Sequence, residues 1–242
     1  MKLGQYLAER LQDLVLESAD VAGFLGKLSE FSSGFIGKAS GLPVQCGVTL
    51  VRNRRSVTAA GSTPAARLLA DFPQAHGQSP GLEALRAGST VSVPDTRFDP
   101  RWRRYNLAVA QAGQRSILAV PLALDQGAAA ALTFFAPETD AFDEEGIVIC
   151  EAYAAKAGKA LRLAVRIGAS KDLNEDLLEA MKSRTTINLA SGIVMGQSRC
   201  SQAEAFAILT KVSNNRNVKL RVVAEELLRN FDKVPGITRF DN

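Results

Sequence analysis

The segment TTINLASGIVMGQSRCSQAEAF, residues 185–206, decides how the C-terminal part of the chain folds. Its apolar residues follow helical spacing up to Gly196, which suits the left-handed position at the end of a helix because it has no Cβ atom. Further on, Ser201 and Glu204 form a capping-box pattern, in which a hydroxyl and a carboxylate satisfy free amides of a first helical turn. The segment therefore predicts one helix that ends near Gly196 and a second that begins after Ser201.

Beyond this segment, the polar residues 213–217 predict a turn, and residues 220–231 again show helical spacing. Upstream, helical spacing from Phe142 predicts a long helix whose periodicity breaks near Gly168 and Arg184. The C-terminal part is thus expected to be a three-helix unit preceded by a long helix. A unit of this size buries little surface. We therefore expect the apolar stripe of the long helix to pair with a second copy as a parallel coiled coil, or alternatively to pack within one chain.

Before the long helix, short apolar runs alternate with turn residues and helical stretches. Asp20 is placed to cap a helix, and Asp125 and Gly127 mark the turn of a hairpin. This mixture predicts an α+β domain with an antiparallel sheet flanked by helices. The expected helices are 1–19, 21–31, 63–72 and 81–88, and the expected strands are 44–51, 56–61, 90–93, 116–124 and 128–135.

Composition argues against several other classes of protein. The 242 residues carry a net charge of +4, and 46% of them are hydrophobic, as in ordinary globular proteins. No run of about 18 apolar residues occurs, and charged residues interrupt the N-terminal segment where a signal peptide has its apolar core. We therefore expect a cytoplasmic protein without a membrane span. Three dispersed cysteines and one histidine fit no metal-site or disulfide spacing, so we expect neither a metal site nor an enzyme.

Positive charge is concentrated near the C-terminus. Between residues 182 and 221, seven basic residues stand against one acid, Glu204, so this segment carries +6. Together with Ser, Asn and Gln side chains, such a surface suits phosphate oxygens and exposed base edges. A solvated basic face is the alternative. The small residues 190–192 let another body approach the helix backbone, either a nucleic acid or a neighbouring helix. The basic residues are Lys182, Arg184, Arg199, Lys211, Arg216, Lys219 and Arg221.

The C-terminal pattern resembles the ANTAR domain, a three-helix RNA-binding module of bacterial transcription antiterminators. The resemblance covers residues 173–231 and rests on Arg184, Ile187, Ala190, Gly192, Met195, Ser201, Glu204, Ala205, Phe206, Leu209, Ser213, Asn217, Lys219, Leu220 and Ala224. The stretches HGQSPGLEALRAGSTVSVPDTRFDPRW (76–102) and GQRSILAVPLALDQGAAAALTFFAPETDAFDEE (113–145) resemble a GAF sensory domain of actinobacterial GAF–ANTAR regulators, over residues 20–168.

The resemblance implies an N-terminal helix (1–19), a GAF domain (20–168), a coiled-coil helix with an ANTAR domain (169–232) and a C-terminal tail (233–242). It implies a homodimer that binds paired RNA hairpins with short loops and so prevents a terminator stem from forming. RNA contacts carried over from the family are Arg184, Asn188, Ala190, Ser191, Met195, Ser213, Asn217 and Lys219, and charge and position add Arg199, Asn214 and Arg216. Many relatives have Lys where this chain has Ser191, and we expect no receiver domain of the kind found in other ANTAR proteins.

Three alternatives stay open at the level of sequence. The cofactor of the GAF domain is unknown: the domain either senses an unidentified small molecule or serves only as a dimerisation platform. Helices 201–214 and 219–230 could instead read DNA as a helix-turn-helix, although Glu225 and Glu226 would then lie close to the duplex backbone. The third alternative is a thiol enzyme, but neither Cys46 nor Cys150 is accompanied by a His or carboxylate constellation.

Overall fold

The computed structural model describes residues 2–52, 56–125 and 127–232. The predicted tail, 233–242, and residues 53–55 of the first hairpin turn lie outside the described residues. Contacts within the chain divide it into two units, Met1–Gly168 and Ala169–Asn242. The long helix α6 (Glu144–Ser198) contributes to both units.

The N-terminal unit is built on a five-stranded antiparallel sheet. Its strands are β1 (Gln45–Arg52), β2 (Ser56–Gly61), β3 (Val91–Val93), β4 (Ser116–Leu122) and β5 (Ala128–Ala136), in the order β2-β1-β5-β4-β3. Strands β1 and β2 form one hairpin, with Val48 opposite Ala60. Strands β4 and β5 form another, with Val120 opposite Leu132, and β1 pairs with β5 to join them. Both hairpins predicted from the sequence are confirmed.

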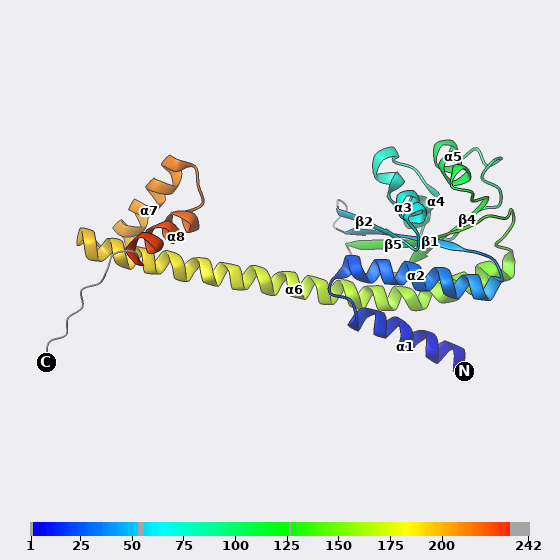
Figure 1. Cartoon of the computed structure of the whole chain (residues 1–242), viewed down its shortest axis with the longest axis horizontal. Coiled ribbons are helices and arrows are strands. Elements are labelled where there is room, and N and C mark those ends of the chain that lie inside the picture. The colour runs from blue at the N-terminus through cyan, green and yellow to red at the C-terminus, as the bar shows by residue number, and fades with distance from the viewer. Residues whose placement is uncertain (1, 53–55, 126, 233–242) are drawn as a thin grey trace. The chain divides into compact units, whose positions relative to one another are not determined.

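Helices cover both faces of this sheet (Figure 1). One face is covered by α2 (Val21–Ser40) and the beginning of α6, with α1 (Lys2–Leu16) packed on the outside of these helices, and the other face is covered by α3 (Pro64–His76), α4 (Pro80–Ala87) and α5 (Arg103–Gln111). Because side chains alternate along a strand, Cys46, Val48 and Leu50 of β1 all enter the core shared with α1, α2 and α6. Ile117 and Phe135 belong to the smaller core on the opposite face. The predicted α+β class is confirmed.

Four helices of this unit differ from the sequence-based expectation. Helix α1 ends at Leu16 instead of residue 19, and α3 continues to His76 instead of residue 72. Helix α2 begins at the predicted cap, where the Gly23 amide donates to Asp20 Oδ1 over 2.7 Å, but it continues to Ser40. Its serines stay helical because their hydroxyls bond within the helix, as when Ser32 Oγ donates to the Leu28 carbonyl (2.6 Å). Helix α5 was not predicted, since a weak apolar pattern around buried Tyr105 and Val109 is its main sequence signal.

The C-terminal unit packs the end of α6 against α7 (Gln202–Arg216) and α8 (Leu220–Asp232). Its core is small, and its buried hydrophobic residues are Ala190, Val194, Ala205, Leu209, Val223 and Ala224. Ala190, Ala205 and Ala224 are fully buried, so their short side chains allow the three helices to approach closely. Of the small residues 190–192, Ala190 therefore lies at the contact between the helices.

Two predicted helix ends in this unit are wrong, namely the end of the long helix near Gly196 and the end of the next helix before residue 213. Helix α6 continues through Gly168, Arg184 and Gly196 to Ser198, and Arg199 takes the left-handed conformation, with φ of 48°. A glycine inside a helix costs about 1 kcal/mol relative to alanine, which the packing of this helix end against α7 outweighs. Helix α7 includes residues 213–216 of the predicted turn and ends at Asn217, with φ of 49°.

Candidate nucleic-acid interface

One strip of candidate residues lies along α6. Arg184, Asn188, Ser191 and Met195 are separated by four, three and four positions, so they follow one side of the helix. Arg184 and Asn188 are exposed and Met195 is partly buried. Ser191 is buried, and its hydroxyl donates to the Ile187 carbonyl over 2.8 Å. The strip therefore offers a guanidinium and an amide to solvent.

Three of the predicted contact residues face the inside of the bundle. Ala190 belongs to the core, Ser191 bonds within α6, and Ser213 is buried on α7. The Ser213 hydroxyl donates to the carbonyl of Val218 over 2.6 Å and thereby ties the end of α7 to the following turn. These three side chains therefore contribute to packing within the unit. The Ser191 and Ser213 hydroxyls donate to backbone carbonyls, and Ala190 has no polar side-chain atom.

A second group of candidate residues meets at the turn between α7 and α8. Asn214, Arg216, Asn217 and Lys219 are all exposed there. Asn217 takes the left-handed conformation, and its amide donates to the Asn214 carbonyl over 3.2 Å. Asparagine tolerates this conformation better than most residues because its short polar side chain can bond locally. The turn thus holds amide and ammonium groups within a few residues of one another.

A shallow groove connects this turn with α6. Lys219 lines the groove together with Ser183 and Ile187, the neighbours of Arg184 on α6, and its volume is about 370 Å³. Arg221 at the start of α8 forms an ion pair with Glu179 of α6 beside the groove. The fold therefore brings Lys219 to Ser183 and Ile187 of α6, together with the acids Asp176 and Glu179, which also line the groove.

The charge of this unit is lower than the sequence suggests, because acids outside the 182–221 segment fold back onto it. Arg216 pairs with Glu226 over 2.7 Å, and Arg221 pairs with Glu179 and, over 3.4 Å, with Glu225. The hydrogen bond from Arg216 lowers the pKa of Glu226, and the same bond raises the pKa of Arg216. Of the seven basic residues in the 182–221 segment, all of which are described, the other five form no ion pair with a described residue: Lys182, Arg184, Arg199, Lys211 and Lys219.

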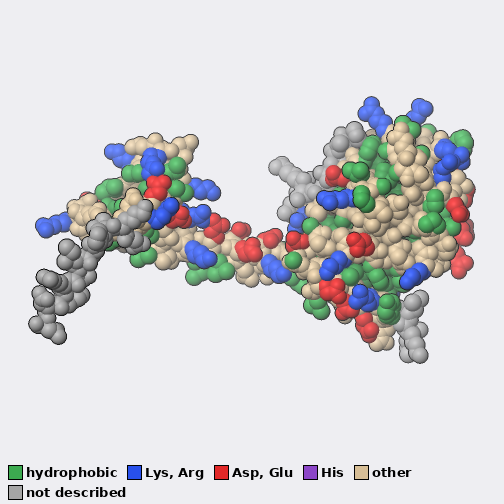
Figure 2. All heavy atoms as spheres, viewed as in Figure 1, with side chains coloured by type: hydrophobic (Ala, Val, Ile, Leu, Met, Phe, Trp, Pro, Cys, Tyr) green, Lys and Arg blue, Asp and Glu red, His purple; other side chains and the backbone are tan. Residues whose placement is uncertain are grey.

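These five cations do not form a single patch. In Figure 2 the Lys and Arg side chains of this unit project in several directions. Lys182 lies about 160° around α6 from Arg184, since each residue turns the helix by about 100°. Arg199 lies in the turn before α7, at the opposite end of α7 from Asn214 and Asn217. Arg184 and Asn188 thus lie on α6 and Asn217 and Lys219 at the α7–α8 turn, where Lys219 lines a groove with Ser183 and Ile187 of α6, while Arg199 lies at the other end of α7.

Helix α7 begins at the predicted capping box. The Glu204 amide donates to Ser201 Oγ over 3.3 Å, and the Ser201 amide donates to a Glu204 carboxylate oxygen over 2.8 Å. Two hydrogen bonds from Ser201 lower the pKa of the Glu204 carboxyl below its ordinary value of 4.5. The bond from the Ser201 backbone amide has the larger effect, and the bond from the Ser201 hydroxyl has the smaller one. A carboxylate with a depressed pKa stabilises the folded state above its unfolded-state pKa and loses that effect as the pH falls through the folded-state value.

We predict that Ser201→Ala weakens the first turn of α7 by about 1 kcal/mol. Hydrogen exchange of the amides of residues 202–205, followed by mass spectrometry, measures this directly. In the wild-type chain the protection contributed by Glu204 is expected to decline as the pH falls below 4.5. Glu204→Gln serves as the control, because it removes that pH dependence. Unchanged protection in Ser201→Ala would show that tertiary packing alone holds this turn.

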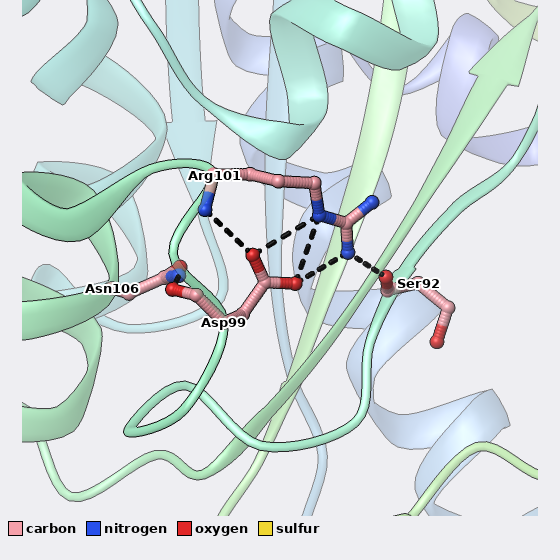
Figure 3. A network of polar contacts seen from close by, with 4 residues as sticks. All are labelled: Ser92, Asp99, Arg101 and Asn106. Carbon is pink, nitrogen blue, oxygen red and sulfur yellow. Dashed lines mark hydrogen bonds and ion pairs between the residues drawn. The ribbon is translucent and has the colours of Figure 1, made fainter.

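In the N-terminal unit, polar contacts fix the loop between β3 and α5 (Figure 3). Asp99 accepts hydrogen bonds from the amide and side chain of Arg101, whose guanidinium also donates to the Ser92 carbonyl over 2.7 Å. Asn106 Nδ2 donates to the Asp99 carbonyl over 3.0 Å. The bonds from Arg101 lower the pKa of Asp99 despite its partial burial. The motif DPRW, residues 99–102, therefore holds this loop in its conformation.

The cysteines of this unit lack the properties of catalytic thiols. Cys46 and Cys150 are buried, and burial raises the pKa of Cys46 and raises that of Cys150 to about 12. A reactive thiol needs an accessible thiolate and a lowered pKa. No group of His, Cys, Asp and Glu residues that could hold a metal ion occurs in the part of the chain that the structure describes.

Comparisons with known proteins identify both units. The model of the GAF domain matches residues 8–162, more than half of the chain, and the model of the ANTAR domain matches residues 175–228. No curated protein matches the chain. No helix among the described residues combines the length and apolar character that crossing a membrane requires.

Several solved structures are similar to this chain at low sequence identity. The N-acylhomoserine lactone dependent LuxR family transcription factor CepR2 from Burkholderia cenocepacia is 16% identical, with a TM-score of 0.51, and the match covers 69% of this chain and 99% of that one. The GAF domain of an Acinetobacter phosphoenolpyruvate-protein phosphotransferase is 13% identical (TM-score 0.46; 69% and 98% covered). A free methionine-R-sulfoxide reductase from Neisseria meningitidis is 18% identical (TM-score 0.44; 66% and 89% covered).

The ANTAR domain is an RNA-binding domain of antiterminators and the GAF domain is a sensor domain, so the two matches assign the chain a regulatory role. The α+β unit with its antiparallel sheet and the helical C-terminal unit agree with both matches. The chain therefore belongs to the GAF family and carries a C-terminal ANTAR domain, as GAF–ANTAR regulators do.

Proposed function

We propose that the protein is a dimeric transcription antiterminator that binds a pair of hairpin loops in nascent RNA. The observation that carries this proposal is the set of exposed polar groups at Arg184 and Asn188 of α6 and at Asn217 and Lys219 of the α7–α8 turn. Its two cations have no ion pair in the described residues, and its two amides can donate to and accept from exposed base edges. Loop bases that are not stacked in a helix present such edges, whereas the deep, narrow major groove of an RNA duplex hides them from side chains.

The mechanism is a shift between two RNA structures. An antiterminator with two hairpins and a terminator stem compete for the same nucleotides, and a protein that binds only the first shifts the population towards it. The protein must bind the antiterminator structure more tightly than the terminator structure. This difference in binding free energy must exceed the difference in free energy between the two RNA structures themselves. A shift from 1:99 to 99:1 needs about 5.5 kcal/mol of differential binding.

An exposed stripe on α6 supports dimerisation. Residues 171–182 are all exposed, and they include Leu173, Leu177, Leu178 and Met181 on one side of the helix, with exposed fractions between 53% and 66%. The acids Asp172, Glu175, Asp176 and Glu179 fall on the opposite side. A parallel coiled coil through the apolar stripe buries the leucines and keeps the acids apart. Arg184 follows Leu177 by seven positions, so the two RNA-binding surfaces would lie near one another.

DNA recognition by α7 and α8 has weaker support. The base-reading position at the start of α8 would have to be filled by Lys219 and Arg221. Arg221 is held by Glu179 and Glu225, and Glu226 is held by Arg216, so the acids of α8 remain close to any duplex placed there.

The N-terminal unit acts in this proposal as the sensor that biases dimerisation or RNA binding.

Competition between RNA and DNA tests the proposed function. A labelled RNA with two short-loop hairpins is bound by the full chain and challenged with unlabelled hairpin RNA or with genomic duplex DNA. We expect only the hairpin RNA to compete efficiently. The logarithm of the affinity should fall with the logarithm of the salt concentration with a slope near −3, as about four phosphate contacts on unpaired RNA require. Preference for duplex DNA, or affinity independent of salt, would refute the proposal.

A further inference from the structure

Arginines are concentrated in one stretch of the N-terminal unit, residues 86–115, which contains β3, α5 and the loop between them. This stretch has six arginines and two acids, so it carries a charge of +4. Asp95 pairs with Arg97 over 2.6 Å. Asp99 pairs with Arg101, so both acids are already neutralised by a neighbour. The other four arginines form no ion pair with a described residue: Arg86, Arg103, Arg104 and Arg115.

Two of these arginines, Arg103 and Arg104, stand in the first turn of α5, and both are exposed. The first turn contains no acid, and the preceding residue, Trp102, makes no capping bond with its side chain. Cations are unfavourable at this end of a helix, because its free amides already carry partial positive charge. Helix stability therefore does not explain the two arginines. Figure 2 shows Lys and Arg side chains gathered around the position of α5 in Figure 1.

An exposed aromatic ring lies in the loop that leads to these arginines. Phe98 is 78% exposed, more than any other aromatic side chain in the described residues. The Arg97 guanidinium lies 5.2 Å from the centre of this ring and is itself held by Asp95. The loop is tied to α5 by the hydrogen bond from Asn106 to the Asp99 carbonyl. The 97–104 segment thus presents an aromatic ring and two unpaired guanidinium groups to solvent.

We propose that the 97–104 segment binds an unpaired strand of RNA. A guanidinium group matches the geometry of phosphate oxygens, and an exposed aromatic ring stacks on a base of any type. Only an unpaired strand offers both, because a duplex keeps the faces of its bases stacked on one another. An acidic protein would pair with the arginines but would leave Phe98 without a planar partner.

This contact belongs to the N-terminal unit and is separate from the hairpin-binding residues of the C-terminal unit. The choice of RNA as the ligand rests on the proposed function, and the strand would be the unpaired nucleotides that flank the hairpins. The contact would then lengthen the bound part of the transcript. It requires no base sequence, since neither stacking nor phosphate binding reads the edges of bases.

Binding of a labelled 12-nucleotide oligouridylate to the full chain, measured by fluorescence anisotropy, tests the proposal. The chain carries Arg184→Ala and Lys219→Ala, so that the proposed hairpin site contributes little. In this background, Arg103→Ala combined with Arg104→Ala should weaken binding about 10- to 30-fold at about 0.1 M salt. The salt slope should become shallower by about 1.4, because each lost phosphate contact on an unpaired strand removes about 0.7.

Replacement of the aromatic ring should have a different signature. Phe98→Ala should weaken binding about 5- to 100-fold, the effect expected for one stacked base. The salt slope should stay the same, since no charge is removed. Phe98→Trp should bind as the parent does, because the larger ring still stacks. Phe98 is exposed, so neither change disturbs the core.

The matched control removes two exposed cations from the other face of the sheet. Lys38 of α2 and Lys159 of α6 are exposed, and neither forms an ion pair with a described residue. Lys38→Ala combined with Lys159→Ala should change the affinity by less than about threefold, because salt screens exposed charges beyond about 10 Å.

Equal losses in the two double variants, or no loss in Phe98→Ala, would overturn the proposal. Tighter binding of a 12-base-pair RNA duplex would overturn it as well. Efficient displacement of the oligouridylate by oligoglutamate would also overturn it, because it would identify an acidic protein as the partner.

Binding of a single hairpin, measured in the chain with Arg184 and Lys219 intact, separates this proposal from the proposed function. Arg103→Ala combined with Arg104→Ala should leave hairpin binding unchanged. Loss of oligouridylate binding in a protein that binds no hairpin would refute the proposed function and support the role of the 97–104 segment.

Discussion

Replacing both Arg184 and Lys219 with alanine should weaken binding to hairpin RNA by about 10²- to 10⁴-fold. Each cation is expected to contribute about 1–3 kcal/mol when it contacts a base edge or phosphate, and 1.4 kcal/mol corresponds to a factor of ten. Lys219 lines the groove between α6 and the α7–α8 turn, and Arg184 follows Ser183, which also lines it. Fluorescence anisotropy with a labelled single hairpin, at several salt concentrations, measures the loss. The salt slope should become shallower by about 1.4, since each lost phosphate contact removes about 0.7.

The matched control removes the same charge elsewhere on the unit. Lys182→Ala combined with Lys211→Ala also deletes two exposed cations that have no ion pair in the described residues. Lys182 lies on the other side of α6 from Arg184, and Lys211 lies about 160° around α7 from buried Leu209. Their effect should stay within about threefold, because salt screens exposed charges beyond about 10 Å. Similar losses in both double variants would mean that general positive charge, and not this surface, binds the RNA.

The sequence predicts the start of a helix correctly where that start depends on residues that are close together in the chain. The cap of α2 at Asp20 and the capping box at Ser201 and Glu204 are formed as predicted, because both depend on residues within four positions of each other. The helix end at Gly196 was predicted from the same kind of local preference and is wrong. Packing of Ala190 and Val194 against α7 extends α6 beyond that glycine, and no local pattern reports such packing.

The candidate site was predictable in its composition and less so in its geometry. The exposed positions of Arg184 and Asn188 follow from helical spacing with the buried residues Ala190 and Val194. The ion pair between Arg221 and Glu179 joins residues 42 positions apart, and its formation depends on how α8 packs against α6. A count of charges along the chain therefore overestimated the positive charge of this unit. The burial of Ser191 and Ser213 likewise depends on tertiary packing.

Introducing two acids into the apolar stripe of α6 should separate binding of a hairpin pair from binding of a single hairpin. Leu177→Glu combined with Met181→Glu places carboxylates where a coiled coil would bury apolar side chains, and buried unpaired charges are strongly unfavourable. We expect affinity for RNA with two hairpins to fall by about 10²- to 10⁴-fold, the gain that simultaneous binding of two sites provides. Affinity for a single hairpin should be unchanged, because Arg184 and Lys219 are intact.

The control for this variant keeps the stripe apolar. Leu177→Met combined with Met181→Leu exchanges the two side chains at nearly constant volume, and both positions are exposed in the single chain, so it should preserve dimerisation and two-hairpin binding. Mass photometry at the nanomolar concentrations used for RNA binding reports the dimer under the same conditions. If the acidic variant stays dimeric and binds the two-hairpin RNA as the parent does, the stripe is not the contact that pairs the RNA-binding surfaces. Loss of single-hairpin binding would instead place Leu177 or Met181 within the RNA-binding surface itself, since Met181 precedes Arg184 by less than one helical turn.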